Sequence, residues 1–450
     1  MKQKRQQHNL FLFQFLCLLV VFEIPIVFSW QNLVYLDLSS NFFQGPLPSS
    51  ICNLKNMEFL VLANNKFSGT IPKCLGNFSS GLNTMDLRNN EFQGTIPTNF
   101  SKDIKLKNIG LNGNNLVGPL PQSIKNCKYL EVLDVGNNKI YDTFPIWLDN
   151  LPQLHVLILR SNKFYGTVIP SKTQFEKLRI VDLSYNNFTG SLPAQFLKNL
   201  PAMMSVRGED GLKYMGDGNG SYYLDSVTLI MKGLEMEIHR VLSIFTTIDL
   251  SGNKFEGEIP ESIGNLYALK LLNLSHNNFN GLIPPALGRL DKLESLDLSW
   301  NQFRGEIPSQ LTNLTSLGTF NVSENQLRGR IPTGNQFGAF SNDSYYGNLG
   351  LCGFPLKDCG PNKDIGYGSN SGSGLWERDV LGLESGFSWK PVVLGYSFGM
   401  SISLAIVGFS LVTGKPKWMM NISEEISRQL GIRSNRKRYV MIGISVLAVT

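Results

Sequence analysis

Leucines recur along most of this chain with a period of 24 residues, once 25, in the pattern LxxLxLxxNxFxGxIP. In each copy the leucines alternate with polar residues, which is typical of a short strand with one buried face. One copy cannot bury its own leucines, so neighbouring copies must stack. The pattern predicts an α/β-type repeat solenoid, with short parallel strands on the concave face and a mostly irregular or 3-10 convex side. The eleven copies begin at Leu33, Met57, Leu82, Leu106, Leu130, Leu154, Leu178, Phe245, Leu269, Leu293 and Leu317.

The polar positions of the repeat also have physical reasons. An asparagine such as Asn301 follows each strand, where its amide can satisfy backbone groups that the turn would leave unpaired. A glycine such as Gly305 suits the tight bend that comes next. The copy at Leu130 replaces the glycine step with residues 141–145, and the copy at Leu154 delays its proline to Pro170. We therefore expect local irregularity in these two copies.

The repeats form two blocks, seven copies in residues 30–199 and four in residues 245–340. Residues 200–244 lack the pattern and form an island. A long insertion in a solenoid is usually functional, although a tolerated insertion is the alternative. Residues 341–360 are expected to cap the open leucine core, and the Gly- and Ser-rich residues 361–390 to form an extracellular linker.

The cysteines fit an oxidising compartment. Cys352 and Cys359 suit a disulfide that staples the C-terminal cap. Cys52 and Cys74 fall at nearly the same place on adjacent coils, within disulfide reach. Cys127 is left over and is expected to be a buried free thiol.

Two apolar runs flank the repeats, and the net charge of +6 resides beside them. The repeat body is not basic, so nucleic acid is not an expected partner. Residues 1–29 have the basic start and apolar run of a secretory signal peptide. Residues 391–414 are long and apolar enough for one transmembrane helix, and the basic residues 415–450 then form a short cytoplasmic tail. We expect a single-pass type I plasma-membrane protein with extracellular repeats.

Gly395, Gly399 and Ser403 form a small-residue face on this helix that suits pairing with another helix. Ordinary glycine use in a membrane helix is the alternative. Eight glycosylation sequons precede the helix and fit a secreted glycoprotein. They are at Asn77, Asn99, Asn187, Asn219, Asn273, Asn313, Asn321 and Asn342.

The chain shows no catalytic constellation. Its four histidines are scattered without metal-ligand spacing, and neither a nucleophile elbow nor a phosphate loop is present. We expect no enzyme activity, no cofactor and no metal.

Five features of the chain resemble plant leucine-rich-repeat receptor-like proteins, which lack a kinase domain. These features are the GxIP repeats, the island ending in the run from Val227, the four repeats after it, the cap sequence from Gly350 to Gly353, and the run from Gly414 to Trp418. The resemblance covers about residues 33–421. The family's N-terminal cysteine-paired cap and many of its repeats are missing, so we expect an N-terminally shortened member.

The resemblance implies that the concave face and island bind an extracellular peptide or microbial pattern. It also implies two partner kinases, a leucine-rich-repeat adaptor receptor kinase at the membrane helix and a somatic-embryogenesis-type coreceptor kinase at the repeats after the island. The coreceptor contacts would be Lys232, Gly233, Thr247, Asp249, Asn273, Asp297 and Asn321.

The function expected from these observations is ligand recognition at the cell surface, with signalling through recruited kinases in plant defence. The alternatives are a truncated non-signalling decoy, a structural binding module and a developmental receptor-like protein.

Overall fold

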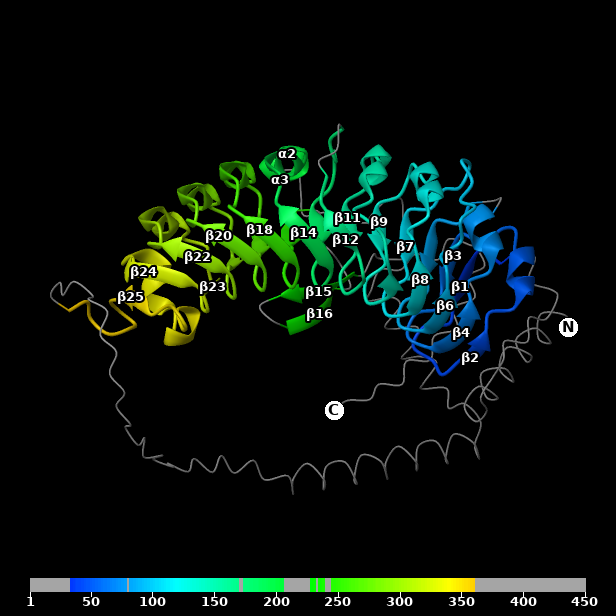
Figure 1. The fold of residues 1–450 in the computed structure, drawn as a ribbon. Coiled ribbons are helices and arrows are strands. Elements are labelled where there is room, and N and C mark those ends of the chain that lie inside the picture. The colour runs from blue at the N-terminus through cyan, green and yellow to red at the C-terminus, as the bar shows by residue number, and fades with distance from the viewer. Residues whose placement is uncertain are drawn as a thin grey trace, which may run out of the picture. The chain divides into compact units, whose positions relative to one another are not determined.

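The computed structural model describes most of the repeat body (Figure 1). The described residues are 33–78, 81–169, 173–205, 227–231, 234–238 and 244–360, with backbone only for 227–231 and 234–238. The expected signal segment, linker, membrane helix and tail lie outside these ranges. Within the described ranges, no helix has the length and apolar character needed to cross a membrane.

Each repeat contributes one three-residue strand to a single parallel sheet of eleven strands (Figure 1). The middle residue of each strand is apolar and lies in the core, as Leu272 and Leu296 do, while its neighbours face outward. This sheet confirms the predicted parallel-strand solenoid. Its strands are β1 (Tyr35–Asp37), β3 (Phe59–Val61), β5 (Thr84–Asp86), β7 (Asn108–Gly110), β9 (Val132–Asp134), β11 (Val156–Ile158), β13 (Ile180–Asp182), β17 (Thr247–Asp249), β19 (Leu271–Asn273), β21 (Ser295–Asp297) and β23 (Thr319–Asn321).

A second set of strands follows the asparagine turn, and it is split into two sheets. The split falls between the repeats that begin at Leu130 and Leu154, where irregularity was expected. Asp142 occupies the bend that Gly118 and Gly166 make with positive φ in the adjacent repeats, and it does not adopt that conformation. The five-stranded sheet contains β2 (Gln44–Pro46), β4 (Lys66–Thr70), β6 (Glu91–Gly94), β8 (Asn115–Gly118) and β10 (Lys139–Ile140). The seven-stranded sheet contains β12 (Tyr165–Thr167), β14 (Asn187–Ser191), β18 (Lys254–Gly257), β20 (Asn278–Gly281), β22 (Gln302–Gly305), β24 (Gln326–Arg330) and β25 (Gly350–Cys352).

Short helices close the coils on the side opposite the eleven-stranded sheet (Figure 1). Most begin directly after the proline of the IP step, such as Pro260 or Pro284, because proline fixes φ and lacks the N–H that a helix start leaves unpaired. The 3-10 helices are η1 (Ser49–Asn53), η2 (Lys73–Asn77), η3 (Gln122–Asn126), η4 (Ile146–Asn150), η5 (Glu261–Asn265), η6 (Pro285–Arg289), η7 (Ser309–Asn313), η8 (Asn335–Ala339) and η9 (Asn342–Ser344), and the α-helices are α2 (Ala194–Lys198) and α3 (Pro201–Met204).

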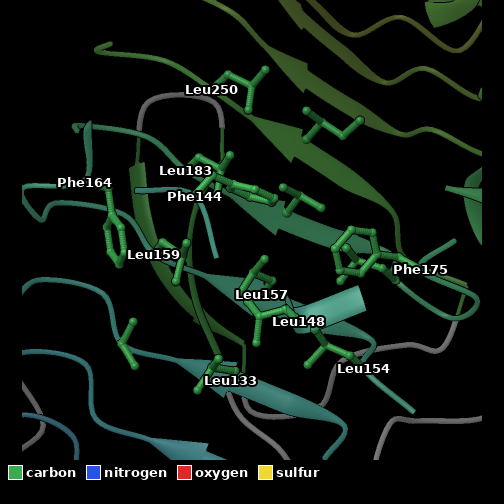
Figure 2. Close-up of a cluster of buried hydrophobic side chains, with 14 of the residues drawn as sticks. Leu133, Phe144, Leu148, Leu154, Leu157, Leu159, Phe164, Phe175, Leu183 and Leu250 are labelled. Atoms are coloured by element: carbon green, nitrogen blue, oxygen red, sulfur yellow. The ribbon is translucent and has the colours of Figure 1, made fainter. Parts of the chain in front are cut away.

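The core is one continuous hydrophobic cluster that runs through every repeat. Figure 2 shows Leu157 and Leu183 in this cluster together with Leu250, which comes from beyond the island. Successive phenylalanines also stack along the array, with 6.0 Å between the ring centroids of Phe255 and Phe279. Burial between coils, rather than within one coil, therefore holds the array together.

The asparagines form a hydrogen-bonded ladder parallel to the core. Asn277 is representative: its Nδ2 donates to Leu250 O at 2.9 Å, and its Oδ1 accepts from the backbone N–H of Phe255 at 3.0 Å. Each rung thus ties its own turn to the preceding coil. Asn348 in the cap continues the ladder by accepting from Leu327 N at 2.9 Å, so the cap begins as a further coil, which the repeat pattern did not reveal.

Two disulfides join described residues. Cys52 and Cys74 link the first two coils with a Cα–Cα distance of 5.7 Å, and Cys352 and Cys359 close the cap at 5.0 Å. Cys127 is a buried free cysteine, and burial raises the pKa of its thiol to about 12. The thiolate, which is the reactive form, is therefore disfavoured.

Candidate functional site

The outward face of the eleven-stranded sheet carries a polar row, formed by the last residue of consecutive strands. Asp182 pairs in register with Asp249, and the row continues through Asn273, Asp297 and Asn321. Parallel strands lie about 4.8 Å apart, so the row places a carboxylate or carboxamide at each step. The row spans the last repeat before the island and all four repeats after it.

Serines fix the orientation of the carboxylates in this row. The backbone N–H and hydroxyl of Ser251 donate to Asp249 Oδ1 at 2.9 and 2.6 Å. Ser184 makes the same pair of bonds to Asp182. The Nδ2 of Asn273 then donates to Asp249 Oδ2 across the coils at 3.2 Å. These bonds hold the row in one arrangement without a ligand.

Burial raises the pKa of two neighbouring carboxyl groups, and like charge adds to the rise at one of them. Burial, followed by the negative charge of Asp182, raises the pKa of Asp249 to about 7. Burial also raises the pKa of Asp182. Two adjacent carboxylates disfavour simultaneous ionisation, so a proton bound at this position is stabilised in the folded state.

Two of the expected coreceptor contacts do not lie on the accessible surface that such a contact requires. Thr247 and Asp249 are buried, with 6% and 5% of their surface exposed. The short strands lie so close together that the side chains of one coil pack against those of the next, as the bond from Asn273 to Asp249 shows. Asn273, Asp297 and Asn321 are half-buried and remain accessible.

A second charged group on the same face lies in the first block of repeats. Arg88 and Asp86 form a buried ion pair of 2.8 Å. Gly110 on the neighbouring strand leaves room for the arginine stem, because a Cβ there would lie 3.3 Å from Arg88 Cδ. Burial also raises the pKa of Asp134 to about 6. We did not select these residues from the sequence, although arginine stands where many repeats have serine.

The described part of the island is an antiparallel hairpin of β15 (Val227–Met231) and β16 (Leu234–Ile238). The expected contacts Lys232 and Gly233 fall between these strands and lie outside the described residues. The island leaves the array between β13 and β17, which nevertheless pair directly. The face is therefore continuous across the insertion.

Among the sequons, Asn77, Asn99, Asn187, Asn313 and Asn342 are exposed, and Asn273 and Asn321 are half-buried on the sheet face. Asn219, Gly395, Gly399 and Ser403 lie outside the described residues. Within the described ranges, no group of three or more His, Cys, Asp or Glu side chains could hold a metal ion.

Comparisons with known families identify the repeats. Two models of the Leucine rich repeat family match this chain, one over residues 104–164 and 245–303, the other over residues 32–54, 56–78, 81–102 and 177–199. Receptor-like protein 33 of Arabidopsis thaliana is 54% identical over 252 residues, which are 55% of this chain and 27% of that protein. Receptor-like protein 9DC3 of Solanum pimpinellifolium is 50% identical over 255 residues, 56% of this chain and 29% of that protein. The chain thus matches under a third of the length of these relatives.

Solved plant ectodomains share the fold. The leucine-rich-repeat ectodomain of the Arabidopsis thaliana membrane receptor kinase GASSHO1/SCHENGEN3, in complex with CASPARIAN STRIP INTEGRITY FACTOR 2, is 29% identical with a TM-score of 0.56, over 73% of this chain and 40% of that one. The Arabidopsis receptor kinase HAESA, in complex with the peptide hormone IDA and the co-receptor SERK1, is 29% identical with a TM-score of 0.52. The match covers 74% of this chain and 52% of that chain. The repeats of this chain thus match the Leucine rich repeat family, and the chain is similar to plant receptor-like proteins.

Proposed function

We propose that this chain acts as a plant cell-surface receptor-like protein. It recognises an extracellular peptide or microbial molecule through the face of its eleven-stranded sheet and its island, and it signals in defence by recruiting partner receptor kinases. The observation that carries the proposal is the direct pairing of β13 with β17 across the island. The repeats before and after the island thereby share one continuous sheet, and the island is inserted between them.

The polar row supports a protein partner on the repeats after the island. Asn273, Asp297 and Asn321 offer accessible amides and a carboxylate at a regular spacing, and such groups suit the hydrogen-bond donors of a partner. The HAESA structure contains a coreceptor together with a peptide hormone, which supports a partner of that kind. We assign this surface, with Lys232 and Gly233 of the island, to a somatic-embryogenesis-type coreceptor kinase. Thr247 and Asp249, being buried, would shape the surface from below.

The second proposed partner is an adaptor receptor kinase within the plasma membrane. Residues 391–414 would form the spanning helix, and Gly395, Gly399 and Ser403 lie on one face of a helix at this spacing. Small residues allow two helix backbones to approach closely, which lengthens their van der Waals contact.

Co-precipitation from plant tissue tests the adaptor interaction without knowledge of the ligand. The tagged full chain should capture the adaptor kinase, and Gly395→Leu with Gly399→Leu should abolish the capture. Gly408→Leu is the matched control, because residue 408 falls on the opposite side of the helix at 3.6 residues per turn. Equal capture by wild type and the double variant, or no capture by wild type, would count against the proposal.

A further inference from the structure

One exposed sequon has an aromatic neighbour on the adjacent coil. Asn187 opens β14, and its register partner in the parallel strand β12 is Tyr165. Register partners in parallel strands lie about 4.8 Å apart with their side chains on the same side. Both side chains are exposed, Tyr165 to 48%. The tyrosine ring therefore stands directly beside the amide that a glycan would modify.

The amide of Asn187 is available for this modification. Its backbone N–H donates to Phe164 O at 2.8 Å, but its side chain makes no hydrogen bond within the part of the chain that the structure describes. Asn273 differs, because its Nδ2 already donates to Asp249 Oδ2 at 3.2 Å. Of these two sequons, only Asn187 presents a nitrogen without a competing partner.

Tyr165 belongs to a small apolar surface on this flank of the array. Val117 and Tyr141 occupy the equivalent position in the two preceding repeats, three residues after the ladder asparagine, and they are 39% and 54% exposed. The surface lies where the second ladder of strands is interrupted. A pyranose ring has an apolar face of C–H groups, which suits stacking on a tyrosine ring whose hydroxyl stays in water.

We propose that Asn187 carries an N-linked glycan whose first N-acetylglucosamine packs against the ring of Tyr165. The proposal rests on the extracellular location that the proposed function requires. In the modification, Asn187 Nδ2 loses a proton and bonds to C1 of the sugar, and the pyrophosphate of the lipid-linked donor leaves. The glycan then covers part of the apolar surface and links the last two coils before the island.

The repeat that contains Asn187 also contains a tyrosine that serves as a control. Tyr185 is 52% exposed, but its ring lies against the turn of the following coil, since a Cβ on Gly252 would be 2.9 Å from Tyr185 Cδ1. The ring of Tyr185 therefore leans away from the coil of Tyr165. A glycan on Asn187 should shield Tyr165 and leave Tyr185 unaffected.

Hydroxyl-radical footprinting with peptide mass spectrometry tests this arrangement. The full chain is produced in plant cells, trimmed by an endoglycosidase to one N-acetylglucosamine per site, and compared with Thr189→Ala, which destroys the sequon. Tyr165 should react several-fold faster in Thr189→Ala than in wild type, whereas Tyr185 should not change. Thr189→Ser keeps the sequon and should retain the protection, and Thr315→Ala, which removes the sequon at Asn313, should also retain it.

Equal reactivity of Tyr165 in wild type and Thr189→Ala would overturn the proposal. So would an unmodified Asn187 in a chain whose Asn313 carries a glycan. If no sequon at all is modified, the extracellular location fails, and the proposed function fails with it.

Discussion

The backbone N–H of Phe188 donates to Oδ1 of Asn253 at 3.0 Å, although 65 residues separate them in the chain. The equivalent bond elsewhere in the ladder spans 21 to 23 residues, with 22 between Phe255 and Asn277. The bond at Phe188 therefore crosses the island and joins the two blocks of repeats as if they were consecutive. The island is an insertion into one array and does not separate two domains at this point.

Replacing Asn253 with alanine should weaken this junction. The change leaves Phe188 N without its acceptor, while Leu183 O loses one donor at 2.9 Å and keeps Asn186 Nδ2 at 3.1 Å. A buried polar group without a partner costs about 1–3 kcal/mol, so we expect a loss of roughly that size or more. Urea unfolding of the purified chain gives the free energy of unfolding. Asn278→Ala, at an exposed asparagine on β20, is the control and should have little effect.

Close approach of the 3-10 helices predicts a second sensitive position. A Cβ on Gly288 in η6 would lie 2.3 Å from the carbonyl oxygen of Gln310 in η7. Gly288→Ala should therefore force the coils apart and destabilise the array by roughly 1–3 kcal/mol. Gly338 in η8 has no atom within 4 Å of its Cβ position, so Gly338→Ala is the matched control. Equal thermal stability of the two variants would show that the helices can shift without cost.

The cap contains a buried tyrosine whose hydroxyl is expected to lower the stability of the fold. Tyr345 is fully buried, and its hydroxyl has no hydrogen-bond partner among the described residues. Tyr345→Phe removes this unsatisfied group while keeping the ring, so the variant should be as stable as wild type or more stable by about 1 kcal/mol. Tyr346→Phe, at a side chain that is 70% exposed, should be neutral. Differential scanning calorimetry measures the thermal stability of both variants. A large loss of stability in Tyr345→Phe would show that the Tyr345 hydroxyl makes a hydrogen bond and would contradict this prediction.

The buried carboxyl pair predicts a dependence of stability on pH. The pKa of Asp249 is about 7 in the folded chain, compared with about 3.9 in an unfolded chain. Between these values the folded state binds more protons than the unfolded state, so this group makes stability fall as pH rises from about 4 to 7. Asp249→Asn should flatten that slope in urea unfolding measured at several pH values. If the dependence of the free energy of unfolding on pH were unchanged in Asp249→Asn, another group would have to titrate in this range.

Most of the fold follows from the repeat itself. The alternation of leucines predicts the strands, and the irregularity expected after Leu130 appears as the break between β10 and β12. The rung at Asn348 was missed because the cap is not a full repeat: Leu351, which enters the core, follows this asparagine by three residues, whereas Phe303 follows Asn301 by two.

The face was harder to predict than the core. Outward strand positions are exposed in one isolated strand, but their burial depends on neighbours that the sequence does not place side by side. Asp249 lies in register between Asp182 and Asn273, and Asp182 is 67 positions earlier, on the other side of the island. Register across an insertion is a tertiary property, and a fixed period cannot supply it.

Recruitment of a somatic-embryogenesis-type coreceptor kinase is the most direct test of the proposed receptor function. The measurement is co-precipitation of that kinase with the tagged full chain from plant tissue treated with a microbial extract that induces the association. Asp297→Arg, which reverses a charge on the sheet face, should abolish recruitment, and Gln302→Arg, at an exposed position on β22 away from that face, should leave it intact. Undiminished recruitment by Asp297→Arg would contradict the assignment of this face to the coreceptor.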